Sequence, residues 1–238
     1  LIRNVSSALS TVTTGTGPRV PLDIDVSPFD NSNTRKEGVS RTYKGTDGYA
    51  PIFGYLGARE GYLVHAELRE GSHHCQKGTP AFLDECLTYS RMITDQPVLV
   101  RMDSGNDCRE NIRICAKHHV DWLIKRNLRK EKPEMWLEWA QQHGEPEQPR
   151  DGKRVWRGST ERAMEDMGPP VRLVYEVIER TIVKGQRLLI PSIEVNTWWC
   201  SLPDPEPDVI RLYHDHGTSE QFHSELKSDM GLERLPSG

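Results

Sequence analysis

The sequence predicts a mixed α/β protein in which helices flank one sheet of parallel and antiparallel strands. Three patterns support this class. Residues 20–27 alternate apolar and polar side chains, as a strand with one apolar face does. Residues 79–94 repeat apolar side chains at helical spacing, and residues 96–105 contain a nearly continuous apolar run that is typical of a buried parallel strand. Strands and helices in this order predict a mixed sheet.

The first three predicted strands precede the first helix. In the segment VPLDIDVS, residues 20–27, Asp23 and Asp25 share the face opposite the apolar side chains. After a polar loop, residues 49–57 and 61–71 are rich in aromatic and β-branched residues, and a short polar connection separates them. This pattern predicts a hairpin.

Two helices and two strands follow the hairpin. Thr79 is the predicted N-cap of the first helix, and the buried strand after it ends at Asp103. This position places the acid at the carboxyl tip of a strand. Asp107 and Glu110 have the spacing of a capping box and predict the start of the second helix. Residues 120–127 return to a strand pattern.

The second half of the chain changes character. A short helical pattern and a segment rich in Pro and Gly precede long antiparallel strand patterns, which predict an inserted β-rich part. A further strand and a final helical run over residues 208–230 close the sequence. The predicted organisation is an N-terminal extension or linker (1–18), the first part of the core (19–127), the β-rich insertion (128–190), and the final strand and helix of the core (191–238).

Composition narrows the possible classes of protein. The chain has 238 residues, of which 35% are hydrophobic and 28% are charged, so it can bury a sizeable core. Its net charge of −4 argues against a general polycationic coat for nucleic acid. The five cysteines form no CxxC pair, which argues against a disulfide framework or a zinc knuckle. Neither a signal peptide nor an apolar window of about 18 residues is present, so we expect a soluble, cytoplasmic protein. The first residue, Leu1, suggests a piece of a longer polypeptide.

Three acidic positions form the strongest chemical pattern. Asp25 or Asp23 lies on the first strand, Asp103 ends a parallel strand, and Glu220 lies in the final helical run. Ligands bind at strand tips in open α/β sheets, and three neighbouring carboxylates stay ionised together only around a cation. Magnesium prefers such oxygen ligands. In the alternative interpretation, the first acid caps a turn and Asp103 simply ends its strand.

The final helical run LYHDHGTSEQFHSELK supports this choice of glutamate. Several of its side chains fall on one helical stripe, and Glu225 lies off it. Gly217 is unfavourable within a helix, and Thr218 could instead begin a new helix. His216, Glu220 and His223 also allow a zinc site, although their spacing is not HExxH. The residues on the stripe are Tyr213, His216, Glu220, His223 and Lys227.

The segments DIDVS, RMDSGND and LYHDHGTSEQFHSELK resemble the catalytic core of bacterial insertion-sequence transposases of the DDE class. In one branch of that family the last acid lies in a signature of Tyr, two residues, Arg, three residues, Glu, six residues and Lys. The sequence is similar to this signature at Tyr213, Glu220 and Lys227, with His216 in place of Arg. The resemblance covers roughly residues 20–235 and implies an RNase H-like mixed sheet with a β-rich insertion between the second and third acids.

The resemblance also implies an activity. Asp25, Asp103 and Glu220 would be catalytic and would bind Mg²⁺, for which Mn²⁺ could substitute. Asp25 is preferred because Ser27 completes the Asp-x-Thr/Ser pattern of the family, and Asp23 remains the alternative. The implied reaction is cleavage of double-stranded DNA at transposon ends and transfer of the 3′-hydroxyl end into target DNA, by a homodimer. A metal nuclease without strand transfer, or an inactive DNA-binding fragment, remains the alternative.

Further residues are expected to contact DNA. The cluster KRNLRK can neutralise phosphates, although a solvated linker is the alternative. Trp156 lies between Arg154 and Arg157 and could stack on a flipped base, or it could belong to the core. His216 offers fewer donors than the arginine that it replaces. The predicted DNA-binding residues are Tyr213, His216, Lys227, Lys125, Arg126, Arg129, Lys130 and Trp156.

Overall fold

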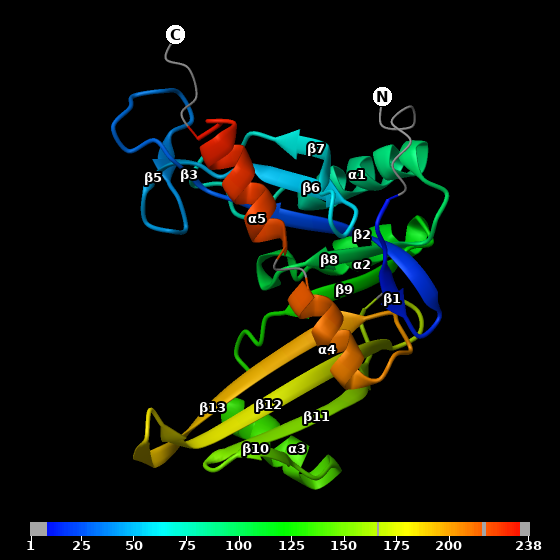
Figure 1. Cartoon of the computed structure of the whole chain (residues 1–238), viewed down its shortest axis with the longest axis vertical. Coiled ribbons are helices and arrows are strands. Elements are labelled where there is room, and N and C mark those ends of the chain that lie inside the picture. Colours follow the sequence, from blue (N-terminus) through cyan, green and yellow to red (C-terminus); the bar gives the residue numbers. More distant parts are fainter. Residues whose placement is uncertain (1–8, 166, 216–217, 234–238) are drawn as a thin grey trace.

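The computed structural model describes residues 9–165, 167–215 and 218–233, without the side chains of residues 218–220 (Figure 1). One large sheet has the strand order β10-β11-β12-β13-β9-β8-β2-β6-β7, with β1 paired to β2. A small sheet has the order β3-β5-β4. The strands are β1 (Val12–Thr14), β2 (Gly17–Val26), β3 (Phe29–Asp30), β4 (Ser40–Arg41), β5 (Asp47–Tyr49), β6 (Ile52–Leu56), β7 (Tyr62–Glu67), β8 (Val98–Met102), β9 (Asp121–Arg126), β10 (Glu147–Arg150), β11 (Lys153–Arg162), β12 (Val171–Val183) and β13 (Gln186–Cys200).

Five α-helices of the described residues flank the large sheet, which confirms the predicted mixed α/β class. They are α1 (Thr79–Ile93), α2 (Arg109–Lys117), α3 (Pro133–His143), α4 (Glu206–His214) and α5 (Thr218–Ser224). A 3-10 turn covers Ser104–Asn106, and a short π-helical segment covers Glu225–Asp229. None of the helices in the described part of the chain is long and apolar enough to cross a membrane.

Strands β2, β8 and β9 form the parallel centre of the sheet. Ile24 of β2 is opposite Met102 of β8, and Met102 is also opposite Ile124 of β9. All five residues of β8 are buried, which explains the nearly continuous apolar run in its sequence, interrupted only by Arg101. Because parallel strands end at the same edge, the residues that follow Ile24 and Met102 meet at one carboxyl edge of the sheet.

Alternate residues of β8 contribute to cores on opposite faces of the sheet. Val98, Val100 and Met102 belong to the larger core, together with residues of α1, α2 and α3. Leu99 belongs to a second core, which α4 covers. A third cluster joins α5 to the hairpin of β6 and β7, whose antiparallel pairing confirms the predicted hairpin.

Two predicted helix caps are wrong. Thr79 is the first residue of α1 rather than its cap, because Gly78 takes the left-handed conformation before the helix (φ 76°). The Thr79 hydroxyl instead donates a hydrogen bond to the backbone carbonyl of Cys75. Helix α2 begins at Arg109, two residues after Asp107. The carboxylate of Asp107 accepts hydrogen bonds from other elements of the sheet.

The β-rich part of the chain continues the core sheet. β11 and β12 are the predicted antiparallel strands, and β12 pairs with β13 along most of its length. The predicted boundary at residue 190 falls inside β13, so this strand belongs to both predicted parts. The predicted core and insertion are therefore successive parts of the sequence, but their strands form one continuous sheet.

The predicted final helix is divided in two. α4 ends at His214, and α5 begins at Thr218, as the alternative with a new helix at Thr218 proposed. His216 and Gly217 lie outside the described residues. The predicted stripe therefore does not run along one continuous helix, and the positions before and after the division are placed by different contacts.

Candidate active site

Asp25 and Asp103 lie at the carboxyl edge of neighbouring parallel strands. Ile24 of β2 is opposite Met102 of β8 in the parallel pairing. Asp25 directly follows Ile24, and Asp103 directly follows Met102. Asp25 is the penultimate residue of β2, and Asp103 is the first residue after β8. The structure therefore brings two of the three predicted acids to one place, as the two strand patterns predicted.

Asp25 is held by its own strand and by α5. Its Oδ1 accepts a hydrogen bond of 2.8 Å from the backbone N–H of Val26. Its Oδ2 lies 2.9 Å from Nε2 of His223, whose Nδ1 lies 2.9 Å from the hydroxyl of Tyr55. A carboxylate only accepts hydrogen bonds, so Nε2 of His223 donates to Asp25, and Nδ1 shares a hydrogen bond with the hydroxyl of Tyr55. Tyr55, His223 and Asp25 thus form a chain that fixes the orientation of the carboxylate.

Close packing seats α5 against the hairpin. Phe222 is buried, and its ring lies 5.4 Å from the ring of Tyr55 between centroids. Gly61 of the turn before β7 has φ of 54°, and a side chain there would collide with the Phe222 ring. This contact and the bond from His223 to Asp25 fix α5 near the carboxyl edge. Glu220 lies in α5, three residues before His223, and its side chain is outside the description.

Asp103 begins a tight turn beside a hollow. Its Oδ1 accepts a hydrogen bond of 2.6 Å from the side-chain amide of Asn106. The Cys75 thiol donates to the carbonyl of Gly105 at 2.9 Å and joins the loop before α1 to this turn. A cavity of about 530 Å³ opens here. Its lining comprises Val26, Arg41, Thr42, Tyr43, Gly71, Ser72, His73, His74, Cys75, Asp103, Ser104 and Gly105.

Asp23 has a structural environment that differs from that of Asp25. It is 1% exposed, and its two carboxylate oxygens lie 2.7 and 2.8 Å from Nε and Nη2 of Arg101. The same guanidinium donates to the carbonyl of Leu212 at the end of α4. A charge buried in this way requires its partner. Asp23 therefore ties β2, β8 and α4 together, and Asp25 is the acid that reaches the open edge.

Two tyrosines lie close enough to Asp25 and Asp103 for the charges of these acids to affect their pKa values. Tyr43 is 69% exposed, but its hydroxyl donates to the carbonyl of Val26 at 3.3 Å, and partial desolvation together with the charges of Asp25 and Asp103 raises its pKa to about 12. Burial and the same two charges also raise the pKa of Tyr213 at the end of α4. The amine of Lys125 lies 6.0 Å from the centroid of the Tyr213 ring. Both phenols therefore stay protonated at neutral pH and can donate hydrogen bonds at the carboxyl edge.

Lys227 reaches the same edge from the π-helical segment. Its Nζ donates a hydrogen bond of 2.7 Å to the carbonyl of Pro28, which follows β2. The amine also lies 5.6 Å from the centre of the Phe29 ring. Burial lowers the pKa of Lys227, although the charge of Asp25 opposes this shift. Lys227 therefore lies near Asp25, and Tyr213, from a separate helical segment, lies near both acids.

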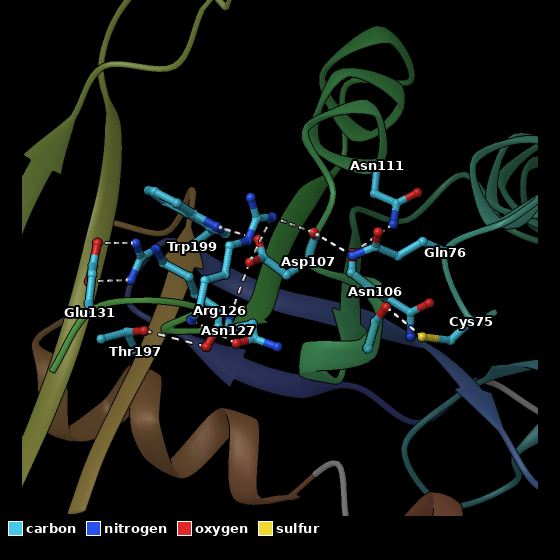
Figure 2. Close-up of polar contacts among 12 residues, drawn as sticks. Cys75, Gln76, Asn106, Asp107, Asn111, Arg126, Asn127, Glu131, Thr197 and Trp199 are labelled. Atoms are coloured by element: carbon cyan, nitrogen blue, oxygen red, sulfur yellow. Dashed lines mark hydrogen bonds and ion pairs between the residues drawn. The ribbon is translucent and has the colours of Figure 1, made fainter. Parts of the chain in front are cut away.

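The KRNLRK cluster lies along a different part of the surface. Figure 2 shows Arg126 paired with Glu131, at 2.9 and 2.6 Å, beside the ring of Trp199. Arg129 is more open: its side chain is 68% exposed and lies 3.5 Å from Asp107. Lys130 is also exposed. The guanidinium of Arg126 is thus occupied by its ion pair with Glu131, whereas the side chains of Arg129 and Lys130 are accessible to a ligand.

Asp107 organises this neighbouring surface (Figure 2). Its carboxylate accepts hydrogen bonds from the Trp199 ring N–H at 2.9 Å and from the backbone N–H of Asn127 at 3.1 Å. Its backbone carbonyl accepts one from the side chain of Gln76 at 3.0 Å. These bonds explain why Asp107 does not cap α2. They join β9, β13 and the loop before α1 next to the turn that carries Asp103.

Trp156 is part of the core in this structure. It is 3% exposed, and the Arg154 guanidinium lies 5.5 Å from its ring centroid. The predicted stacking on a flipped base requires an open ring face, which this burial removes. The alternative interpretation of Trp156 as a core residue agrees with the structure.

The residues at the carboxyl edge are suited to a hard cation by their chemistry. Asp25 and Asp103 offer carboxylate oxygens, which Mg²⁺ and Mn²⁺ prefer. Among the residues whose side chains are described, no group of three or more His, Cys, Asp or Glu residues could hold a metal. Glu220 is outside that set. His223 is bonded to Asp25 and Tyr55, so both of its ring nitrogens are already used.

Sequence reasoning missed several residues of this site. Tyr43 comes from a polar loop with no periodic pattern, and Tyr55 was expected only as a strand residue. His223 carried a signal, because it lies on the same predicted stripe as Glu220 and Lys227. From the sequence, His223 was considered only as a possible zinc ligand. In the structure, its ring is bonded to Asp25 and orients that carboxylate.

Paired carboxylates at the tips of adjacent parallel strands, beside a hollow, are typical of proteins that act on phosphate esters with divalent cations. The chain belongs to the family described as transposase DDE domain group 1, whose sequence model matches residues 15–238. The resemblance to DDE transposases is thereby confirmed.

The structure is similar to that of a piggyBac transposase in a synaptic complex with hairpin DNA, at 10% sequence identity and a TM-score of 0.48. The similarity covers 87% of this chain and 40% of that chain, so this chain spans less than half of that protein. A search of curated proteins gave no match.

Proposed function

We propose that this chain is the catalytic domain of a DNA transposase of an insertion sequence. It cleaves double-stranded DNA at the transposon ends and transfers the 3′-hydroxyl ends into target DNA. The observation that carries the proposal is the position of Asp25 beside Asp103 at the carboxyl edge of β2 and β8. Membership of the DDE transposase family supports it. We assign the sheet to the RNase H-like class, with α3 and β10–β12 as the inserted part.

Asp25, Asp103 and Glu220 are the residues that would hold Mg²⁺ or Mn²⁺. A divalent cation bound there would activate the attacking water or hydroxyl and neutralise charge on the phosphodiester. The contact from His223 to Asp25 supports the inclusion of Glu220, because it fixes α5 against this edge. The protein's own contribution is to position the DNA and to place donors around the phosphate.

Lys227 and Tyr213 are the proposed donors to the scissile phosphate. Tyr213 has a raised pKa and so keeps its phenolic proton, and Lys227 carries a positive charge close to Asp25. Lys125, Arg129 and Lys130 are proposed to contact phosphates farther along the DNA. Arg126 contributes less because Glu131 occupies its guanidinium. A homodimer that holds two DNA ends completes the proposal.

The direct test is Asp103→Asn in the protein with DNA that carries its cognate ends. We expect Mg²⁺-dependent nicking to be lost while DNA binding changes little, because the substitution removes a charge without a change in size. Asp95→Asn is a matched control, since Asp95 is exposed before the opposite end of β8. Undiminished nicking by Asp103→Asn would exclude the proposed site.

Strand transfer requires a separate assay. With ends that are already cleaved, a transposase joins the 3′-hydroxyl to target DNA, whereas a metal nuclease of the same fold leaves the ends unjoined. Joined products that disappear in Asp103→Asn support the transposase. Nicking without joining would favour the nuclease.

A further inference from the structure

The hairpin of β12 and β13 extends beyond the edge of the sheet that carries the acids. β13 pairs with β9 only from Thr197, opposite Arg126, to Cys200. Residues 186–196 therefore continue past the carboxyl end of β9, which is parallel to β8 and, through β8, to β2. Figure 1 shows the far end of this hairpin projecting away from the rest of the molecule. Because four residues of β13 lie opposite one residue of β12 near the turn, β12 sets the length of the hairpin, and its residues 176–183 reach about 25 Å at about 3.4 Å per residue.

The turn and a bulge shape the end of the hairpin. Lys184 and Gly185 both have positive φ, 50° and 78°, as a two-residue turn of type I′ requires. Between the register pairs of Arg180 with Ser192 and Ile182 with Arg187, β13 contains extra residues. These residues, 188–191, form a bulge, which displaces their side chains from the regular alternation.

The bulge exposes two adjacent apolar side chains. Leu189 is 104% exposed and Ile190 is 82% exposed, the highest values among the large hydrophobic residues that the structure describes. Pro191 follows them and is also exposed. We name residues 184–191 the hairpin tip. Such exposure has a cost in water, so two neighbouring apolar side chains at the end of an arm indicate a contact surface.

The segment that forms the hairpin tip carries positive charge. The segment TIVKGQRLLIPSI, residues 181–193, contains Lys184 and Arg187 but no Asp or Glu. Both basic residues are exposed. The nearest acid of β13, Glu194, is paired with Arg180 at 2.8 Å. The chain as a whole has a net charge of −4, so this arm differs from the average surface and is complementary to a polyanion.

We infer that the hairpin tip binds the minor groove of DNA, with Leu189 and Ile190 wedged between base pairs and with Lys184 and Arg187 on the flanking phosphates. Apolar wedges flanked by basic residues are a common means by which proteins kink DNA through the minor groove. The inference rests on the proposed function, because it concerns the same DNA. It adds a second contact, at a distance from the acids.

The length of the arm predicts where this contact falls. A reach of about 25 Å corresponds to about seven base pairs at about 3.4 Å per pair. A protein partner is less suited to this surface. Two apolar side chains provide far less than the area of about 800 Å² per partner that stable protein interfaces bury.

The test uses the full chain and a duplex of about 40 base pairs with central TA steps, which is nearly straight unless a protein bends it. Fluorophores at the two ends report bending by energy transfer, and anisotropy reports binding at several salt concentrations. We compare the wild type with Leu189→Ala/Ile190→Ala and with Lys184→Gln/Arg187→Gln. Met92→Ala is the control, because Met92 is an exposed apolar residue of α1.

We expect the wild type and Met92→Ala to raise energy transfer equally. Leu189→Ala/Ile190→Ala should bind with the same salt dependence but leave the duplex straight. Lys184→Gln/Arg187→Gln should lower the slope of log K against log salt by about 2, because two phosphate contacts are lost. All four proteins should have the same melting temperature, since the substituted side chains are exposed.

Equal bending by the wild type and Leu189→Ala/Ile190→Ala would overturn the inference. So would a change of that variant from dimer to monomer with unchanged bending, which would assign the hairpin tip to a second copy of the chain. These outcomes differ from a failure of the proposed function. That function fails if Asp103→Asn nicks DNA as the wild type does, whatever the hairpin variants do.

Discussion

Nε2 of His223 lies 2.9 Å from Oδ2 of Asp25, across nearly the whole length of the described chain. This contact joins the first strand of the parallel centre to α5, the helix that contains Glu220. Among the described residues, the other oxygen, Oδ1, accepts a hydrogen bond from the backbone N–H of Val26 at 2.8 Å. The two ends of the sequence are therefore held together at the proposed catalytic edge.

His223→Ala should lower the rate of DNA nicking by about 10- to 100-fold, the usual effect of a lost residue that orients a ligand. The carboxylate of Asp25 would lose its fixed orientation. Tyr55→Phe is the milder comparison, because it removes the hydroxyl and keeps the His223 ring in place. Nicking rates at several Mn²⁺ concentrations measure the effect. A loss that high Mn²⁺ partly restores supports positioning, and a His223→Ala enzyme with the wild-type rate at every concentration contradicts it.

Substitution of Asp23 should affect the stability of the protein, whereas substitution of Asp25 should affect its catalysis. Asp23→Asn leaves Arg101 as a buried charge without its partner and should lower the free energy of unfolding by about 3 kcal/mol. Asp25→Asn should leave the unfolding free energy nearly unchanged and abolish nicking. Urea denaturation followed by circular dichroism measures the first quantity. The assignment is wrong if Asp23→Asn is as stable as the wild type and Asp25→Asn is active.

Tyr43 should titrate late and affect stability at high pH. Its pKa is raised to about 12, whereas the unfolded phenol has a pKa of about 10. The folded state therefore keeps this proton where the unfolded state loses it, so its contribution to stability is complete below about pH 10 and is lost as pH approaches about 12. Stability of Tyr43→Phe should fall less steeply across this window. An identical pH dependence of the two proteins would refute the assignment.

Arg129 and Arg126 should differ in their effect on DNA binding. Arg129→Gln should weaken binding and lower the salt slope by about 1, because its exposed guanidinium is free to contact a phosphate beyond its weak pairing with Asp107. Arg126→Gln should chiefly lower the melting temperature, since it breaks the two contacts with Glu131. Binding isotherms at four salt concentrations and thermal melts distinguish them. Equal salt slopes for Arg129→Gln and the wild type would exclude this contact.

Much of the fold could be predicted because its patterns are local. The nearly continuous apolar run of β8 reflects burial on two faces, the alternation in β2 reflects one apolar face, and both strands lie where they were expected. The acids at their ends followed from the same patterns. The cap at Asp107 was wrong because long-range hydrogen bonds from Trp199 and Asn127 outweigh a local capping preference.

Other features depend on contacts that local patterns do not carry. The chain from Tyr55 through His223 to Asp25 joins residues that are far apart in sequence, so neither residue type nor spacing reveals it. Trp156 has the composition of a nucleic-acid contact, with arginines on both sides, but the pairing of β11 with β12 turns its ring into the core. The start of a new helix at Thr218 was one of the alternatives in the sequence, because glycine is locally unfavourable within a helix.

We propose that Asp25, Asp103 and Glu220 form one cation site. The most direct measurement is anomalous diffraction from crystals soaked in Mn²⁺. We predict a peak within coordination distance of both Asp25 and Asp103, which disappears in crystals of Asp103→Asn. A peak on the nitrogens of His216 or His223 instead, or Mn²⁺ bound equally well by Asp103→Asn, would contradict the account.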